Sequence, residues 1–311
     1  MEYLAIVFGI ILLIKGGDWL LEAAISLSLR LNIPKIVIGM TIVSFATSAP
    51  ELIVSVNAAL NGYSDLALGN VVGSNVANLA FVLGVVLVVS PIDVPKAFYK
   101  TDWPMMFIAT LLFYFFIIQD SILSQWEGGV MVIILVLFLI ILLFFQGKET
   151  EQQALNFTEF KPIGKTLLSL SFGGFCLWLG AEVLIKGAVT LAKELGVSER
   201  VISITVVSVG TSIPELSASL IAIINKEKAI SIGNLIGSNL FNILAVMGIT
   251  SVIAPIVVED QNLLQVDFPW MIFVSAFILP LVILPKKMQL GRRSGILLLI
   301  FYLLFIFKMF L

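Results

Sequence analysis

Stretches of apolar residues long enough to cross a lipid bilayer recur along the whole chain, and they constrain its fold more than any other feature. A helix needs about 20 mainly apolar residues to span about 30 Å of hydrocarbon. We predict ten such spans, at residues 2–26, 36–60, 65–90, 103–119, 127–146, 166–186, 200–224, 228–254, 268–285 and 294–311. Apolar residues make up 59% of the 311 residues and charged residues 12%, which is about half the charged share of a soluble domain. The sequence therefore predicts an all-α protein that crosses the membrane repeatedly.

Basic residues are concentrated in the loops that follow the odd-numbered spans. These residues are Arg30, Lys35, Lys96, Lys100, Lys148, Lys161, Lys165, Lys226, Lys228, Lys286, Lys287, Arg292 and Arg293. Because cytoplasmic loops carry an excess of Lys and Arg, we predict a protein of the cell (inner) membrane with both termini on the extracytoplasmic side. The net charge of −2 gives no indication of a nucleic-acid partner. The lipid bilayer is the expected surrounding, and no obligatory protein partner is inferred.

The two halves of the chain are copies of each other. Residues 39–84 align with 203–248 without a gap at an offset of 164, with nineteen identities in forty-six positions. Both copies contain T-S-x-P-E followed by G-N-x-x-G-S-N-x-x-N. Each half has five predicted spans, so the second copy must enter the membrane from the opposite face. This predicts two inverted five-helix repeats, 1–146 and 166–311, joined by a short cytoplasmic linker at 147–165, with a substrate site near the bilayer midplane.

One glutamate lies deep within an apolar span in each copy, Glu51 in the second span and Glu215 in the seventh. An ionised carboxylate near the bilayer centre costs several kcal/mol unless a cation or another partner faces it. Basic residues are nearly absent from the membrane interior, since only Lys15 and Lys186 come close, and long side chains of this kind can reach the interface. Two carboxylates related by the repeat therefore predict a doubly charged site for a divalent cation.

A proline directly precedes each of these glutamates, at Pro50 and Pro214. Proline removes a helical N–H and clashes with the carbonyl of the preceding turn, so we expect broken helices at the midplane. Unwound backbone is tolerated at that depth if it lines a cavity, and its carbonyls and the neighbouring hydroxyls would offer oxygen ligands. The residues concerned are Ser44, Thr47, Ser48, Ser208, Thr211 and Ser212. Calcium accepts about six to eight oxygens in flexible geometry, which suits such a set.

The third and eighth spans carry a second set of polar residues. Two pairs are four residues apart and each pair shares a helix face: Ser74 with Asn78, and Ser238 with Asn242. Their oxygens would complete the ligand shell. The other four asparagines of these motifs are expected to lie off this face and to bridge helices by hydrogen bonds: Asn70, Asn75, Asn234 and Asn239.

Small and acidic residues elsewhere in the repeats leave two interpretations open. The glycines of the spacings at Gly69, Gly73, Gly233 and Gly237 suit either close helix packing or a direct role in the site. Asp18 and Glu182, in the first and sixth spans, are either acids along an access path or solvated helix ends.

The segments A-T-S-A-P-E at 46–51 and G-T-S-I-P-E at 210–215, each followed by G-N-x-x-G-S-N, resemble the two alpha-repeats of prokaryotic sodium/calcium exchangers in the calcium/cation antiporter superfamily. The resemblance covers the whole chain. It implies secondary active antiport of sodium and calcium by alternating access, with no cofactor besides the transported ions. The ligands it implies are Glu51, Glu215, Thr47, Thr211, Ser48, Ser212, Ser74, Ser238, Asn78 and Asn242, with backbone carbonyls at Ser44 and Ser208. The archaeal exchangers of this family carry Asp where this chain has Asn242, which leaves two carboxylates in the predicted centre.

Other functions stay open from the sequence. Proton-coupled exchange of calcium or another divalent cation would use the same glutamates, although relatives of that kind usually carry G-N-x-x-E in place of T-S-x-P-E. An intramembrane enzyme is disfavoured because a chain with 0 histidines has neither the usual zinc-protease motif nor a Ser-His catalytic pair. A passive channel fits less well, since paired glutamates in a pinched site suit occlusion better than rapid conduction. The sequence therefore predicts a transporter and not an enzyme.

Overall fold

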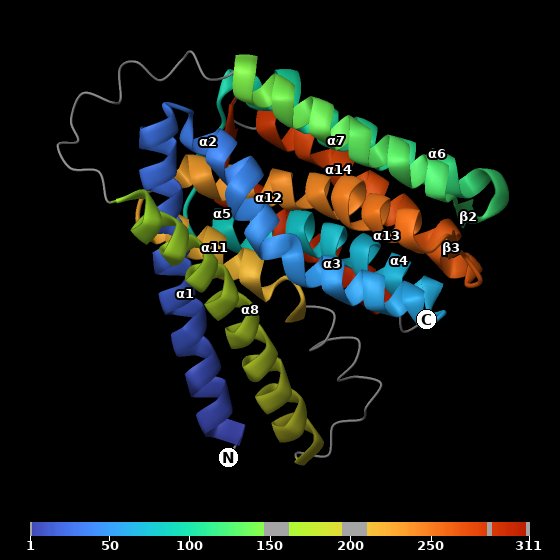
Figure 1. Cartoon of the computed structure of the whole chain (residues 1–311), viewed down its shortest axis with the longest axis horizontal. Helices are drawn as coiled ribbons and strands as arrows, with labels where there is room; N and C mark the ends of the chain where they lie inside the picture. The colour runs from blue at the N-terminus through green and yellow to red at the C-terminus, as the bar shows by residue number, and fades with distance from the viewer. Residues whose placement is uncertain (1, 146–161, 195–209, 285–287, 309–311) are drawn as a thin grey trace. The chain divides into compact units, whose positions relative to one another are not determined.

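The computed structural model describes residues 2–145, 162–194, 210–284 and 288–308, and within them the secondary structure is almost entirely helical (Figure 1). Packing divides the chain into two compact units. Unit 1 comprises Met1–Thr47 and Ile140–Asn234, and unit 2 comprises Ser48–Leu139 and Leu235–Leu311. The helices α3 (Ser44–Leu60), α7 (Gln125–Phe145) and α12 (Lys228–Leu240) contribute residues to both units. Each unit mixes residues from both sequence halves, so this division by packing differs from the division by repeat.

The remaining elements belong to one unit each. Unit 1 also contains α1 (Glu2–Leu31), α2 (Lys35–Ile38), the π-helical segment η1 (Gly39–Val43), α8 (Ile163–Glu194) and α11 (Ile213–Ile224). Unit 2 also contains the helices α4 (Ser64–Val76), α5 (Leu83–Val89), α6 (Trp103–Asp120), α13 (Gly248–Ile253), α14 (Phe268–Ile283) and α15 (Arg292–Lys308). Its π-helical segments are η2 (Ala77–Val82), η3 (Phe98–Asp102), η7 (Phe241–Met247) and η8 (Leu263–Asp267), and its strands are β1 (Ile92–Asp93), β2 (Ile122–Leu123), β3 (Ile256–Val257) and β4 (Gln289–Leu290).

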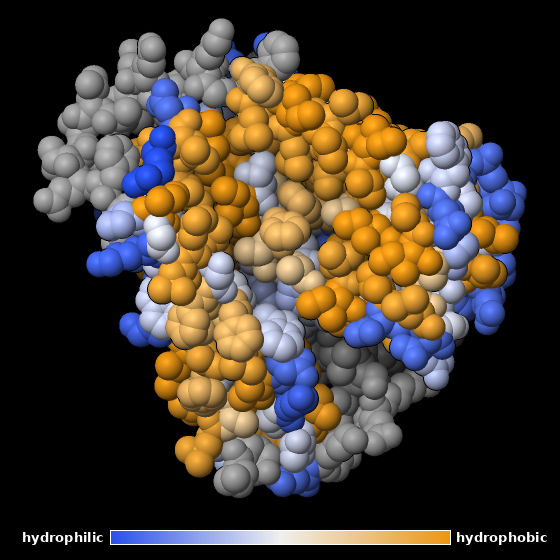
Figure 2. Space-filling model, viewed as in Figure 1, coloured by the Kyte–Doolittle hydropathy of each residue, from blue (hydrophilic) through white to orange (hydrophobic). Residues whose placement is uncertain are grey.

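The length and the apolar surface of these helices suit a lipid environment. Within the described residues, eight helical segments are long and apolar enough to cross a membrane. The other two predicted spans contain the shorter apolar helix α11 and the 17-residue helix α15. Apolar side chains also cover much of the face shown in Figure 2; on α7, for example, Ile133, Val136 and Leu137 form an exposed stripe. An apolar surface of this extent suits hydrocarbon, so the chain is a helical protein that passes through the membrane several times.

Several boundaries differ from the sequence prediction. Helix α1 continues to Leu31, and α8 extends over residues 163–194, so positions 163–165 of the predicted linker are helical. Two antiparallel pairs of two-residue strands, β1 with β4 and β2 with β3, add short ladders to a fold that we predicted as all-α. Such short strands leave no trace in the pattern of long apolar segments. The first part of the predicted span 200–224 lies outside the described residues.

Helices α1 and α8 of unit 1 lie side by side (Figure 1) and contact each other through glycines. A Cβ atom added to Gly9 would lie 2.8 Å from the carbonyl oxygen of Gly180, and one added to Gly16 would lie 2.9 Å from that of Gly173. The residue numbers rise along one helix as they fall along the other, so the pair is antiparallel. At the offset of 164, Gly9 corresponds to Gly173 and Gly16 to Gly180. Each contact therefore joins one glycine to the repeat counterpart of the other.

Three contacts in unit 2 each connect two loops that both follow odd-numbered spans or both follow even-numbered spans. In unit 2, β1 follows the third span and pairs with β4, which follows the ninth. Strand β2 follows the fourth span and pairs with β3, which follows the eighth. The carboxylate of Asp65, after the second span, accepts hydrogen bonds from the backbone N–H groups of Glu259 and Asp260, after the eighth, at 3.0 and 2.9 Å. These contacts require the loops that they connect to lie on one side of the membrane.

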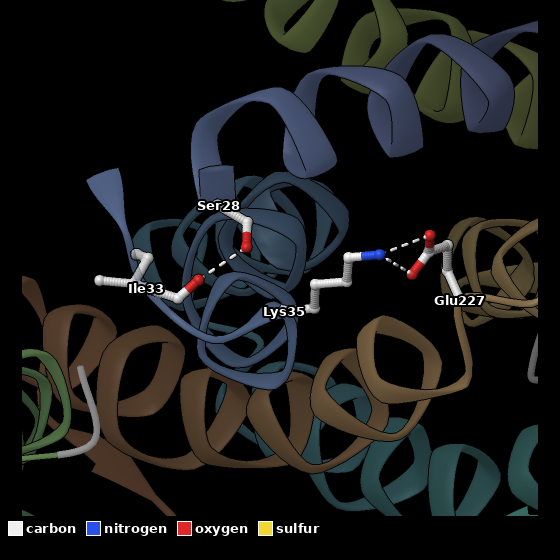
Figure 3. A network of polar contacts seen from close by, with 4 residues as sticks. All are labelled: Ser28, Ile33, Lys35 and Glu227. Carbon is white, nitrogen blue, oxygen red and sulfur yellow. Dashed lines mark hydrogen bonds and ion pairs between the residues drawn. The ribbon is translucent and has the colours of Figure 1, made fainter. Parts of the chain in front are cut away.

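An ion pair in unit 1 connects two loops that both follow odd-numbered spans (Figure 3). The Nζ atom of Lys35, at the start of α2, lies 2.7 and 2.8 Å from the two carboxylate oxygens of Glu227, between α11 and α12. Nearby, the hydroxyl of Ser28 donates to the carbonyl oxygen of Ile33 at 2.6 Å and closes the end of α1. The pair thus fixes the entry of α2 against the turn that precedes α12.

Replacing Lys35 with Met is expected to lower the free energy of unfolding by about 1 kcal/mol. The side chains of Lys35 and Glu227 are 24% and 18% exposed, so the pair is partly screened by solvent while the remaining carboxylate loses its partner. The measurement is the thermal unfolding midpoint of the purified protein in detergent. The control is the charge swap Lys35→Glu with Glu227→Lys, which restores an ion pair; a swap that destabilises as much as the single variant would contradict this account.

Candidate cation-binding site

Helix α3 carries a line of buried polar side chains. Its members are at most 2% exposed and are spaced three or four residues apart: Ser44, Thr47, Ser48, Glu51 and Ser55. This spacing places them along one side of the helix. The helix break predicted here is wrong, because α3 remains α-helical through Pro50 and the irregular backbone lies earlier, in η1. In a packed bundle the carbonyl that a proline leaves unbonded can be satisfied by neighbouring groups, so the helix need not unwind.

The equivalent segment of the second copy contains a turn at the position of the predicted break. Helix α11 begins one residue before Pro214, and Thr211 and Ser212 form a turn ahead of it. Glu215 lies in the first helical turn and is 0% exposed, where the partial positive charge of the helix N-terminus favours a carboxylate. Ser212 is also buried, and Thr211 is half-buried. Ser208, predicted to offer its carbonyl, lies outside the described residues.

The predicted amide ligands lie in π-helical segments of unit 2. Asn78 is the second residue of η2, and Asn242 is the second residue of η7. Ser74 and Ser238 precede them by one turn, and all four side chains are at most 2% exposed. Within the described part of the chain, the amide oxygen and nitrogen atoms of both asparagines have no hydrogen-bond partner. Because such buried polar atoms are rare and π-helical turns recur at functional sites, Asn78 and Asn242 are strong candidates for binding an ion.

Two hydrogen bonds that occupy equivalent places in the repeats connect the glutamate-bearing helices to their neighbours. In unit 2, the amide nitrogen of Asn70 donates to the hydroxyl of Ser55 at 3.0 Å. In unit 1, the amide nitrogen of Asn234 donates to the hydroxyl of Ser219 at 3.1 Å. The prediction that Asn70 and Asn234 bridge helices is therefore confirmed. Ser55 and Ser219 were not predicted to have a role, although both are among the identities at offset 164.

The other two asparagines of the motif differ from each other. The amide of Asn75 donates to the sulfur of Met271 in α14 at 3.7 Å and so bridges two helices, as predicted. The amide of Asn239 donates to the carbonyl of Leu235 within its own helix at 2.7 Å. The prediction that Asn239 bridges two helices is therefore wrong as far as the described residues show. An amide can reach its own helix backbone four residues earlier, and sequence spacing does not distinguish that contact from one between helices.

The glycines of the third and eighth spans also differ. A Cβ atom on Gly233 would meet the backbone carbonyl oxygen of Ile36, so this glycine permits close packing of α12 in unit 1. A Cβ atom on Gly69 would meet only the side chain of Leu263 at 3.7 Å, and one on Gly73 would meet no described atom within 4 Å. Close packing therefore explains Gly233 but not Gly69 or Gly73.

Of the two acids for which the sequence left two interpretations, Glu182 matches the solvated one. It forms an ion pair with Lys186 one turn later at 2.8 Å, and its side chain is 44% exposed, as expected of a solvated helix surface. Asp18 lines an open pocket of about 450 Å³ in unit 1 together with Lys15, Glu22 and Asn225. The pocket has both acidic and basic walls.

The chemistry of the buried residues suits a hard cation. Within the described ranges, no three His, Cys, Asp or Glu side chains gather into a group that could hold a metal ion. Apart from Glu51 and Glu215, the buried candidate side chains offer neutral oxygens of hydroxyl and amide groups. Calcium and other hard ions prefer such oxygen ligands, whereas transition metals favour imidazole and thiolate.

Comparison with known proteins identifies relatives along the whole chain. A family model described as sodium/calcium exchanger protein matches residues 1–144 and 165–311. The chain is 31% identical over 351 aligned positions to the sodium/calcium exchanger MaX1 of Methanosarcina acetivorans, covering 100% of this chain and 99% of that protein. It is 29% identical to the inner membrane protein YrbG of Escherichia coli, covering 94% of this chain and 92% of YrbG.

A solved structure of the sodium-calcium exchanger NCX_Mj, soaked with sodium and strontium, shares the fold. Its TM-score is 0.83, its sequence identity is 28%, and the match covers 97% of this chain and 96% of that one. The family model, the relatives and this structure agree over nearly the full length. The chain therefore belongs to the sodium/calcium exchanger protein family.

Proposed function

We propose that this protein exchanges sodium for calcium across the membrane by alternating access. The observation that carries the proposal is the complete burial of two repeat-equivalent carboxylates, Glu51 at 1% and Glu215 at 0% exposure, in helices of a membrane protein. A buried carboxylate at such a depth is stable only with a cation or another partner. Membership of the exchanger family and the similarity to MaX1 and NCX_Mj, both sodium/calcium exchangers, support sodium and calcium as the ions.

The ligands of this proposal are the residues that the two copies duplicate. Their side chains or carbonyls are those of Glu51, Glu215, Thr47, Thr211, Ser48, Ser212, Ser44, Ser208, Ser74, Ser238, Asn78 and Asn242. Both asparagines are neutral, so the two glutamates carry the charge of the set. Two negative charges balance one calcium ion or two sodium ions. Calcium and sodium compete for the same oxygens, and each bound set allows the switch between the inward-facing and outward-facing states.

We also propose that the two halves are inverted repeats. The antiparallel glycine contacts of α1 with α8 support this arrangement, because two elements related by a two-fold axis make reciprocal contacts of this kind. The strand pairs support it as well: β1 and β3 are equivalent at offset 164, and β1 pairs with β4 while β3 pairs with β2. The substrate site then belongs near the midplane.

The proposed orientation places both termini on the extracytoplasmic side of the inner membrane. The pairing of Lys35 with Glu227 supports a shared side for the loops after the first and seventh spans. The hydrogen bonds of Asp65 do the same for the loops after the second and eighth. The excess of Lys and Arg in the odd-numbered loops then marks that side as cytoplasmic.

The test is uptake of radioactive calcium into proteoliposomes loaded with sodium, with potassium or with a proton gradient. Uptake that requires an outward sodium gradient is the expected result. Uptake driven by protons instead would show a proton-coupled antiporter, and uptake without any counter-ion would show a channel. Transport of magnesium or manganese in place of calcium would correct the substrate.

A further inference from the structure

We propose that the hydrogen bonds Ser55–Asn70 and Ser219–Asn234 are a matched pair of positioning contacts, which hold each glutamate-bearing helix in register with the helix that carries the serine and asparagine ligands. The inference rests on the proposed function and deepens it. It assigns a role in ion binding to four residues that contribute no proposed ligand atom themselves.

The geometry of the two bonds is nearly identical. The donor–acceptor distances are 3.0 Å in unit 2 and 3.1 Å in unit 1. Ser55 and Ser219 are both 0% exposed, and Asn234 is 1% exposed. The hydroxyl of Ser55 also lies 3.5 Å from the carbonyl oxygen of Ala67, so it bonds to the neighbouring helix α4 at two points. A contact kept in two copies that have otherwise diverged is under a constraint common to both.

The positions of the four residues explain what the bonds fix. Ser55 lies one helical turn after Glu51, and Asn70 lies one turn before Ser74. The amide nitrogen of Asn70 also lies 3.5 Å from the backbone carbonyl oxygen of Glu51 itself. Because an α-helix rises about 5.4 Å per turn, the bond is anchored within one turn of a ligand on each helix. Sliding either helix by a fraction of a turn would break it.

The spacing along α4 shows that the predicted position of Asn70 off the ligand face is wrong. Asn70, Ser74 and Asn78 are four residues apart in succession, so Asn70 shares the ligand face instead of lying off it. The second copy repeats this spacing at Asn234, Ser238 and Asn242. One stripe on each helix therefore carries first the positioning asparagine and then the two proposed ligands.

Asn234 makes more contacts than Asn70 among the described residues. Its amide oxygen accepts a hydrogen bond from the hydroxyl of Thr47 at 3.3 Å, and its backbone carbonyl accepts one from the hydroxyl of Ser44 at 2.9 Å. The hydroxyl of Thr47 lies at the same distance, 3.3 Å, from the carbonyl oxygen of Ser44 in its own helix. Asn234 thus positions ligands of both copies within unit 1, so its loss should weaken ion binding more than the loss of Asn70.

The experiment compares Ser55→Ala, Ser219→Ala, Asn70→Ala, Asn234→Ala and the double variant Ser55→Ala with Asn70→Ala. The half-saturating calcium concentration and the maximal rate of sodium-driven uptake are measured in proteoliposomes, and the folded yield is measured by size-exclusion chromatography. Each serine variant is expected to raise the half-saturating concentration about ten-fold, since an unmade buried hydrogen bond leaves its partner unsatisfied, while the folded yield stays near that of the unmodified protein. The double variant should be no worse than Asn70→Ala alone, and Asn234→Ala should show the largest rise.

The matched control is Ser231→Ala. Ser231 is buried in α12, its hydroxyl has no hydrogen-bond partner among the described residues, and the equivalent position of the first copy is already alanine, at Ala67. It should leave the half-saturating concentration unchanged. The proposal is overturned if the serine variants bind calcium like the control, or if they reduce only the folded yield. The shift of the thermal unfolding midpoint that calcium induces in detergent is measured on the same variants. If the unmodified protein shows no sodium-driven uptake, the proposed function is refuted. The thermal shifts of the variants still test the positioning role, because they report calcium binding without transport.

Discussion

Replacing Glu51 with Gln is expected to abolish sodium-driven calcium uptake, and Glu215→Gln is expected to do the same. The amide has nearly the shape of the carboxylate, so the change removes one negative charge from a site that has two proposed charges for one calcium ion. Loss of one charge from a buried, paired set costs about 3 kcal/mol or more, which corresponds to a loss of about 100-fold or more in the rate at low calcium. The measurement is the initial rate of uptake into proteoliposomes under an outward sodium gradient.

The control for this prediction is Glu259→Gln, which removes an acidic side chain that is exposed between α13 and α14. Its uptake rate should stay within about two-fold of the unmodified protein, because exposed charges are screened. If either Glu51→Gln or Glu215→Gln retained half of the uptake, that glutamate would not be a ligand. If both did, the cation site would lie elsewhere.

Replacing Gly39 or Gly233 with Val is expected to prevent the protein from folding stably. A Cβ atom on Gly39 would lie 2.5 Å from the carbonyl oxygen of Ile230, and one on Gly233 would overlap the carbonyl oxygen of Ile36. These obstacles are backbone atoms that cannot move aside as a side chain can. Forcing atoms into a packed interior costs about 1–3 kcal/mol when side chains can adjust, and an approach between two backbones adds to that cost.

Size-exclusion chromatography in detergent and the thermal unfolding midpoint measure this effect. Gly129→Val in α7 provides the matched control, because no described atom lies within 4 Å of a Cβ atom built there. The control should give a monodisperse peak and an unchanged midpoint, while the variants at Gly39 and Gly233 should aggregate. A Gly39→Val protein that unfolded at the temperature of the control would show that η1 and α12 do not approach each other so closely.

The spans were predictable because the bilayer imposes a simple rule of length and apolarity. All ten predicted segments contain helix in the described residues, and the errors occur at ends such as Leu31, where α1 continues beyond the predicted span. The path of the backbone inside a span was harder to predict. Pro50 suggested a break that α3 does not have, and the π-helical turns η2 and η7 have the same apolar composition as the α-helices around them.

The burial of the candidate ligands followed from the sequence, whereas the contacts that position them did not. Charge in an apolar span is a strong signal, so Glu51 and Glu215 were evident. A buried serine such as Ser55 or Ser219 is unremarkable in a membrane helix, and only its identity at the repeat offset distinguished it. The contrast between the equivalent glycines Gly69 and Gly233 was not accessible either, since the same motif position has different neighbours in the two copies.

The ion pair between Lys35 and Glu227 has no counterpart in the other copy, where the equivalent positions are Glu199 and Tyr63. In a duplicated transporter without such differences, the inward-facing and outward-facing states would be equally populated at rest. A partly exposed ion pair contributes up to about 1 kcal/mol. If the pair formed in only one of the inward-facing and outward-facing states, it would favour that state by up to about five-fold. The bias does not alter the final ion gradients, which depend on stoichiometry. Such a bias would determine the side of the membrane to which the empty site of the resting transporter is open.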